Sequence, residues 1–169
     1  MEKMLKKLKK FIVVAVAGIM LSTGFATVAP NEAHAAHWAD KQMNWALNKR
    51  IITADLRNNY ATRQDAWLMI SRATQPLFLF NGYEQARQSV IKNRISDGTR
   101  GTDWVTRNEM AAMIYNYTAR DRDGWTSHGG FEEAIRWGRI MGIYDGSRGN
   151  DPATRAEVVT MLYNAFRNR

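Results

Sequence analysis

Apolar side chains recur at intervals of three and four residues in six stretches of this chain, a spacing that places them on one face of an α-helix. The clearest example is the stretch 38–49, in which Ala39, Met43 and Ala46 line such a face. The same spacing returns in stretches that begin at residues 63, 83, 107, 131 and 155, and polar loops lie between the members of each pair. The pattern predicts an all-α fold.

The predicted helices form three pairs, because one sequence motif occurs three times. A Thr-Arg-x-(Asp/Glu) tetrapeptide begins the second helix of each pair, and an isoleucine precedes each tetrapeptide by eleven positions. The tetrapeptides begin at Thr62, Thr106 and Thr154, and the isoleucines are Ile51, Ile95 and Ile143. Internal self-similarity is the signature of a repeat architecture. We therefore predict three helix–loop–helix repeats, at about 37–74, 83–118 and 130–167.

The first and fourth residues of the motif predict a capping box. A threonine at a helix start accepts a hydrogen bond from the backbone N–H three residues later, and the carboxylate at that position accepts one from the threonine N–H. The predicted pairs are Thr62/Asp65, Thr106/Glu109 and Thr154/Glu157. Capping accounts fully for both residue types.

Capping does not explain the arginine in the second position of the motif. Arg63, Arg107 and Arg155 would lie in the first helical turn, where the helix dipole disfavours a cation by about 0.3–1 kcal/mol. One explanation is an external anion, held between the guanidinium and the free N–H groups of the helix start. The other is a surface arginine paired with a nearby carboxylate of the protein. The sequence leaves both explanations open.

The loops of the second and third repeats share the pattern Asp-Gly-(Thr/Ser)-Arg-Gly-(Thr/Asn)-Asp, beginning at Asp97 and Asp145. Glycine readily adopts positive φ, so a pair of tight turns explains the pattern. The same loops would also place hydroxyls, amides and carboxylates beside the arginine-bearing helix starts, and such a polar rim suits a sugar. The two interpretations are compatible.

Residues 1–35 have the layout of a secretory signal peptide. Five lysines precede an apolar core at 11–21, and Ala33-His34-Ala35 is a small-x-small cleavage site. That core of about 11 residues is shorter than the roughly 20 that a retained membrane anchor needs. We predict cleavage after Ala35, a single domain at 36–169, and contact with a membrane only through the leader before cleavage.

Two stretches are predicted to connect the repeats. The apolar run 77–82 is expected to pack on the core and to end in an Asn-Gly turn, and the polar run 118–130 is expected at the surface. Residues 121–124 faintly resemble a calcium loop, but the acidic residues that an EF-hand needs on either side of the glycine are absent. No metal or cofactor site is predicted.

The composition of the chain limits the classes of partner that it can bind. The chain has no cysteine, so an exported domain must be stable through packing alone, which suits a Gram-positive envelope. Five of the 24 basic and two of the 16 acidic residues lie in the leader, which leaves a net charge of +5 carried mostly by arginine. This charge fits an anionic polymer, although solubility alone also explains it. Nucleic acid would fit the charge equally well, but export argues against it.

The repeats resemble the S-layer homology domain in degenerate form. The resemblance rests on His37-Trp38-Ala39, Ile51 and Thr62-Arg63, echoed by Gly142-Ile143 and Thr154-Arg155-Ala156-Glu157. It implies a pseudo-threefold helical unit with grooves between neighbouring motifs. Only the third copy keeps Thr-Arg-Ala-Glu intact, and the loops are about five residues shorter than is usual in the family, judged by the spacing from isoleucine to threonine.

The resemblance also implies a function. S-layer homology domains anchor exported proteins to secondary cell wall polysaccharide, typically through its pyruvylated sugar, and the motif arginine contributes to their grooves. We therefore name as candidate ligand-binding residues the three motif arginines, the tryptophan of the first motif and the first aspartate of each glycine-bearing loop: Arg63, Arg107, Arg155, Trp38, Asp97 and Asp145.

Two functions follow from the sequence. The first is an exported, non-catalytic protein, secreted or wall-associated in a Gram-positive envelope, that binds an anionic cell wall glycan. The alternative is a protein-interaction module on the same scaffold, which would bind another envelope protein through an aromatic patch that includes Trp67, Trp104 and Trp125. An enzyme is not predicted, because neither His37 nor His128 lies in a recognisable acid–base arrangement.

Overall fold

The computed structural model describes residues 36–75, 82–118 and 131–167, and residues 37–169 form one compact unit. Its helices are α2 (Asp40–Asn48), α3 (Arg63–Thr74), α4 (Tyr83–Lys92), α5 (Arg107–Thr118), α6 (Glu132–Ile140) and α7 (Arg155–Phe166). The predicted all-α class is confirmed. Among the described residues, none of the helices is long and apolar enough to cross a membrane.

Several predictions fall outside the described residues. They are the signal peptide, the larger part of both connectors, the faint calcium loop at 121–124, and the tryptophan at position 125.

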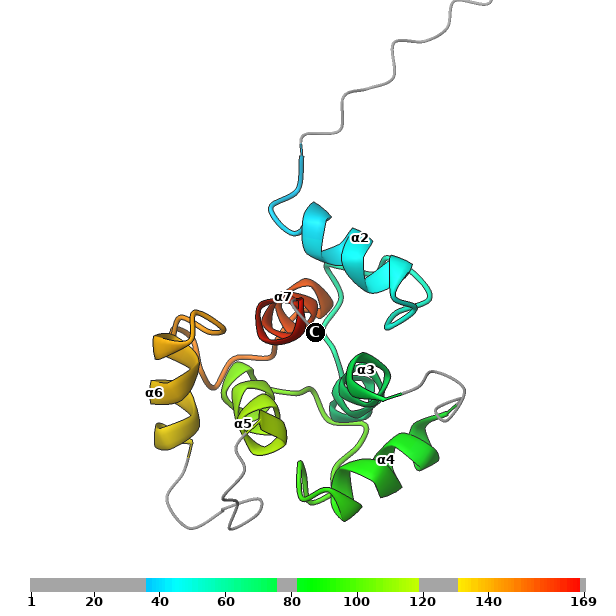
Figure 1. Cartoon of the computed structure of the whole chain (residues 1–169), viewed down its shortest axis with the longest axis vertical. Coiled ribbons are helices and arrows are strands. Elements are labelled where there is room, and N and C mark those ends of the chain that lie inside the picture. Colours follow the sequence, from blue (N-terminus) through cyan, green and yellow to red (C-terminus); the bar gives the residue numbers. More distant parts are fainter. Residues whose placement is uncertain (1–35, 76–81, 119–130, 168–169) are drawn as a thin grey trace, which may run out of the picture. The chain divides into compact units, whose positions relative to one another are not determined.

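The second helices of the three pairs lie side by side, and each first helix packs outside one of them (Figure 1). Helix α7 contacts both α3 and α5. The partner of each first helix comes from the preceding pair: α4 packs against α3, and α6 packs against α5. Helix α2 packs against α7, so the first and last pairs of the chain also meet.

The predicted capping boxes are confirmed. Thr62 and Thr154 each accept a hydrogen bond from the backbone N–H three residues on, and Asp65 and Glu157 each accept one from the threonine N–H. At the start of α5 the N–H of Thr106 donates to Glu109 Oε2 at 2.9 Å, and Glu109 N–H donates to Thr106 Oγ1 at 3.2 Å.

Short bridges join the segments that precede α3, α5 and α7. Ala61 N–H donates to Ala153 O, Val105 N–H to Ala61 O, and Ala153 N–H to Val105 O, each at 2.9 Å. All three residues are fully buried. These three hydrogen bonds close a ring, so the backbone at the starts of the three central helices is held by its own polar groups.

One expected surface residue lies in the core. Trp67 is only 2% exposed, and its indole N–H donates to Ser96 Oγ at 3.2 Å. The prediction that Trp67 forms part of an exposed aromatic patch is wrong. It lies on the same face of α3 as other buried residues, including Ala66 and Ile70, and this face packs inward.

Candidate functional site

The motif arginines turn toward the protein's own carboxylates. Arg63 is fully buried: its Nη1 lies 2.6 Å from Glu109 Oε1, its Nη2 lies 2.8 Å from Asp97 Oδ1, and its Nε donates to Thr99 O at 2.9 Å. A side chain with no exposed surface cannot meet an external ligand. The prediction that Arg63 binds ligand is therefore wrong, and Asp97 serves as one of its internal partners.

Arg107 repeats this arrangement one pair further along the chain. Its guanidinium forms ion pairs with Glu157 and, at 2.8 Å, with Asp145, and its Nε donates to Ser147 O at 3.1 Å. The Arg107 side chain is 9% exposed. Its nitrogens already donate to the protein, although part of the side chain still reaches the surface.

The motif carboxylate has two roles. One oxygen of Glu109 accepts from Thr106 N–H in its own helix, and the other accepts from Arg63 of the neighbouring helix. Glu157 divides its oxygens in the same way between Thr154 N–H and Arg107. We call each arginine–carboxylate contact a junction, named by its helices: α3–α5 for Arg63, α5–α7 for Arg107 and α7–α3 for Arg155.

The helix starts do not offer free N–H groups to an anion. Arg63 N–H donates to Asp103 O and Gln64 N–H donates to Gly101 O, both at 2.9 Å. The first two N–H groups of α5 and α7 donate to loop carbonyls in the same way. Of the two explanations left open for the motif arginines, pairing with carboxylates of the protein is confirmed. An external anion held by free N–H groups at these helix starts is ruled out, because the loop of another repeat already occupies those groups.

The α7–α3 junction differs from the other two. Within the described residues Arg155 has one ion pair, with Asp65 Oδ1 at 3.4 Å, and its side chain is 15% exposed. Its Nε is buried without a hydrogen-bond partner among the described residues. Thr53 stands where Asp97 and Asp145 stand in the other loops, nine positions before the motif threonine. Arg155 is thus the motif arginine with unused hydrogen-bonding capacity.

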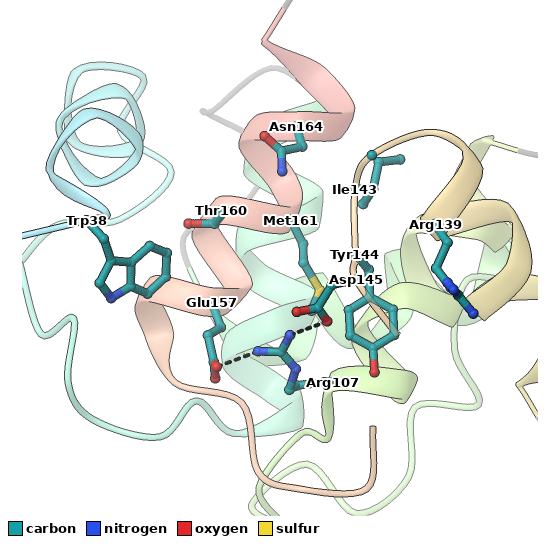
Figure 2. A pocket seen from close by; sticks show the side chains of 11 residues that line it. Trp38, Arg107, Arg139, Ile143, Tyr144, Asp145, Glu157, Thr160, Met161 and Asn164 are labelled. Atoms are coloured by element: carbon teal, nitrogen blue, oxygen red, sulfur yellow. Dashed lines mark hydrogen bonds and ion pairs between the residues drawn. The ribbon is translucent and has the colours of Figure 1, made fainter. Parts of the chain in front are cut away.

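A pocket of about 530 Å³ lies beside the α5–α7 junction (Figure 2). It is lined by Trp38, Arg107, Arg139, Gly142, Ile143, Tyr144, Asp145, Glu157, Thr160, Met161 and Asn164. Figure 2 shows Trp38 on one side of α7 and Tyr144 with Asp145 on the other, with the Arg107 guanidinium between Glu157 and Asp145. Three predicted site residues, Trp38, Arg107 and Asp145, therefore meet in one pocket. Arg63, Asp97 and Arg155 do not line it.

The two carboxylates of the pocket are held in the charged form. For Glu157, burial alone would raise the pKa, but hydrogen bonds from Thr154 N–H and Arg148 and the charge of Arg107 outweigh it and lower the pKa. For Asp145, burial is likewise outweighed by hydrogen bonds from Ser147 and from Arg107, so its pKa is also lowered. Neither group is suited to act as a general acid near neutral pH.

Sequence reasoning missed several residues of the pocket. Thr160 and Asn164 lie on the α7 face that lines it, and Arg139 is an exposed residue at the end of α6. Arg139 forms no ion pair within the described parts of the chain, in contrast to Arg107. The sequence signal for Arg139 was weak because it lies outside the repeated motif.

Comparison with known proteins adds no family. No protein-family model matches the chain, and no curated protein is similar to it. The resemblance to the S-layer homology domain stays a prediction.

Proposed function

We propose that this protein is an exported, non-catalytic binder of a Gram-positive cell wall glycan, and that the glycan occupies the pocket beside Trp38. The observation that carries the proposal is the lining of this pocket: an indole that is 60% exposed stands beside hydroxyl, amide and carboxylate groups. Ligand sites commonly combine an apolar surface with a few polar groups that fix orientation.

The lining suits a sugar ring for a physical reason. The face of an indole carries negative partial charge, and the C–H groups on the apolar face of a sugar carry positive partial charge, so the two stack. The ring hydroxyls would then bond to side chains such as Asn164 and Asp145, which also line the pocket (Figure 2).

Arg139 supports an anionic ligand. Arg107 is already neutralised by Glu157 and Asp145, so it adds little attraction for a second anion. Arg139 brings a positive charge that no described carboxylate pairs. An arginine of this kind binds a carboxylate through two parallel N–H donors. A pyruvylated secondary wall polysaccharide, the ligand that the S-layer resemblance implies, carries such a carboxylate.

A pull-down on purified walls tests the proposal. The protein should bind intact walls and lose most binding to walls stripped of their polysaccharide with hydrofluoric acid. Trp38→Ala and Arg139→Gln should each weaken binding to intact walls by about five- to fifty-fold, equivalent to roughly 1–2.3 kcal/mol. Arg136→Gln, three residues earlier on the same helix, is the control and should bind as before. Equal binding to stripped walls would contradict the proposal.

A protein partner is the second candidate. Ile140 and Met141 at the end of α6 are 78% and 58% exposed, which is unusual for large apolar side chains that lie next to each other. If they form the binding surface, Ile140→Ser should abolish capture of an envelope protein. Binding to the wall, which depends on Trp38, should remain unchanged.

A further inference from the structure

A pair of exposed aromatic rings does not belong to the lining of the pocket. Tyr60 and Trp104 are 50% and 53% exposed, and their ring centroids are 5.9 Å apart with an interplanar angle of 54°. Each occupies the same place in its repeat, two positions before the motif threonine, where the third repeat has Pro152. Neither residue lines the pocket beside Trp38.

The backbone at these two positions is held by bridges to the neighbouring segments. Tyr60 bridges to Thr154, and Trp104 bridges to Thr62, in the hydrogen-bonded ring that precedes the central helices. Successive residues of an extended segment point to opposite sides. The next residues, Ala61 and Val105, are fully buried. The Tyr60 and Trp104 side chains therefore point outward from the hydrogen-bonded backbone. A preordered backbone loses little conformational freedom when a ligand binds.

The polar groups of the two rings are unused. Within the described residues the Trp104 indole N–H and the Tyr60 hydroxyl make no hydrogen bond. Asp103, the residue before Trp104 in the sequence, has a carboxylate that is more than half exposed. The aromatic surface therefore carries two hydrogen-bonding groups of its own, the indole N–H and the phenol hydroxyl.

These features favour a sugar over a protein partner. A fully covered aromatic side chain buries about 150–250 Å², so two half-exposed rings offer on the order of 200 Å². A stable protein interface needs about 800 Å² from each partner, and its core is depleted of charged residues. The stacked face of a single sugar ring matches the smaller area, and its hydroxyls can pair with the unused indole N–H and phenol hydroxyl.

We propose that Tyr60 and Trp104 form a second glycan-contact surface, which binds a neutral sugar ring by its apolar face. This proposal takes the source of the glycan, the cell wall, from the proposed function. The residues and the chemistry of the ligand follow from the structure of the aromatic pair itself. A protein with two separate sugar contacts would hold a wall polymer more tightly than either contact alone if the polymer spans both.

The test uses two neutral probes, chitotriose and cellotriose, and the ¹⁵N-labelled protein. The indole N–H resonance of Trp104, assigned by its loss in Trp104→Phe, should shift and saturate with at least one probe. Measured by calorimetry, which does not need the indole resonance, Trp104→Ala and Tyr60→Ala should each weaken that binding at least five-fold. Trp104→Phe should weaken it less than Trp104→Ala because a ring remains.

Trp38→Ala is the matched control, since it removes another exposed indole. It should leave the Trp104 shift unchanged. Absence of a saturable shift with both probes, or its loss in Trp38→Ala, overturns this inference. Loss of wall specificity in the pull-down, with the Trp104 shift intact, overturns only the function proposed for the pocket. Thermal unfolding of each variant confirms that the fold is retained.

Discussion

Two of the three junctions are closely matched, and the third is looser. At the α3–α5 and α5–α7 junctions, the arginine meets a glutamate, a loop aspartate and a loop carbonyl. At the α7–α3 junction, Arg155 meets Asp65 at 3.4 Å and leaves its buried Nε without a partner among the described residues. The repeated motif therefore does not guarantee a repeated environment.

The difference has identifiable causes in the sequence. Asp65 is one methylene shorter than the glutamates at the equivalent positions, so it reaches less far toward the neighbouring arginine. The loop of the first repeat has Thr53 in place of an aspartate, and Leu56 in place of the arginines at 100 and 148. Those arginines give Glu109 and Glu157 a second cation, which Asp65 lacks.

The largest expected effect comes from removing the buried arginine. Arg63→Ala leaves Glu109 without its buried partner, and breaking a buried ion pair by removing one member typically costs about 3–5 kcal/mol. Arg155→Ala should cost about 1 kcal/mol, because the contact is longer and more exposed. Urea unfolding of both variants measures the difference. Equal losses would show that the junctions are energetically alike.

Acid should weaken the closely matched junctions next. The pKa values of Asp97, Asp145 and Glu157 are lowered in the fold, because hydrogen bonds and arginine charge outweigh the effect of burial. A carboxyl whose folded pKa lies below its unfolded pKa stabilises the fold above the unfolded value, and this is lost as the pH falls through the folded value.

The ordinary pKa values are 3.8 and 4.5. The unfolding free energy should therefore be nearly constant above about pH 5.5 and should fall below about pH 4. Urea midpoints between pH 3 and 7 measure this. Asp145→Asn should give a shallower decline, because one of the titrating groups is gone. If the unfolding free energy of that variant falls with pH as steeply as before, Asp145 does not contribute to the loss of stability in acid.

The smallest expected effect is a gain at the α7–α3 junction. Thr53→Asp supplies the carboxylate that the other loops have, and a partly exposed ion pair with Arg155 should add about 0.5 kcal/mol. The same substitution in an Arg155→Ala background is the control and should add nothing, since the two changes act through one contact. A gain that persists without Arg155 would point to another cause.

Local features of the sequence predicted much of this fold. The helices and their capping threonines follow from spacing and side-chain chemistry over three or four residues. The partners of the arginines could not be predicted in this way, because Glu109 lies 46 positions beyond Arg63 and Glu157 lies 50 beyond Arg107. An arginine at a helix start suggested an external anion, but the anion that it contacts is the carboxylate of another repeat.

The candidate site was predicted only in part, because its residues also lie far apart in the sequence. Trp38, Arg107 and Asp145 come from different repeats, yet they meet in one pocket. Arg139 was not predicted, because it lies outside the repeated motif. Trp67 was assigned to an exposed patch although it stands among the apolar residues of α3, whose helical spacing predicts a buried face.

The hydrogen-bonded ring at residues 61, 105 and 153 limits how this protein can change its length in evolution. In an open helical array, each added unit extends the stack, and atypical end units cover its exposed faces. Here each of the three segments donates to one neighbour and accepts from the other, so no segment is terminal. Deleting one repeat would leave an unsatisfied donor and acceptor, and a fourth could enter only by opening the ring. The repeat number is thus fixed by backbone geometry.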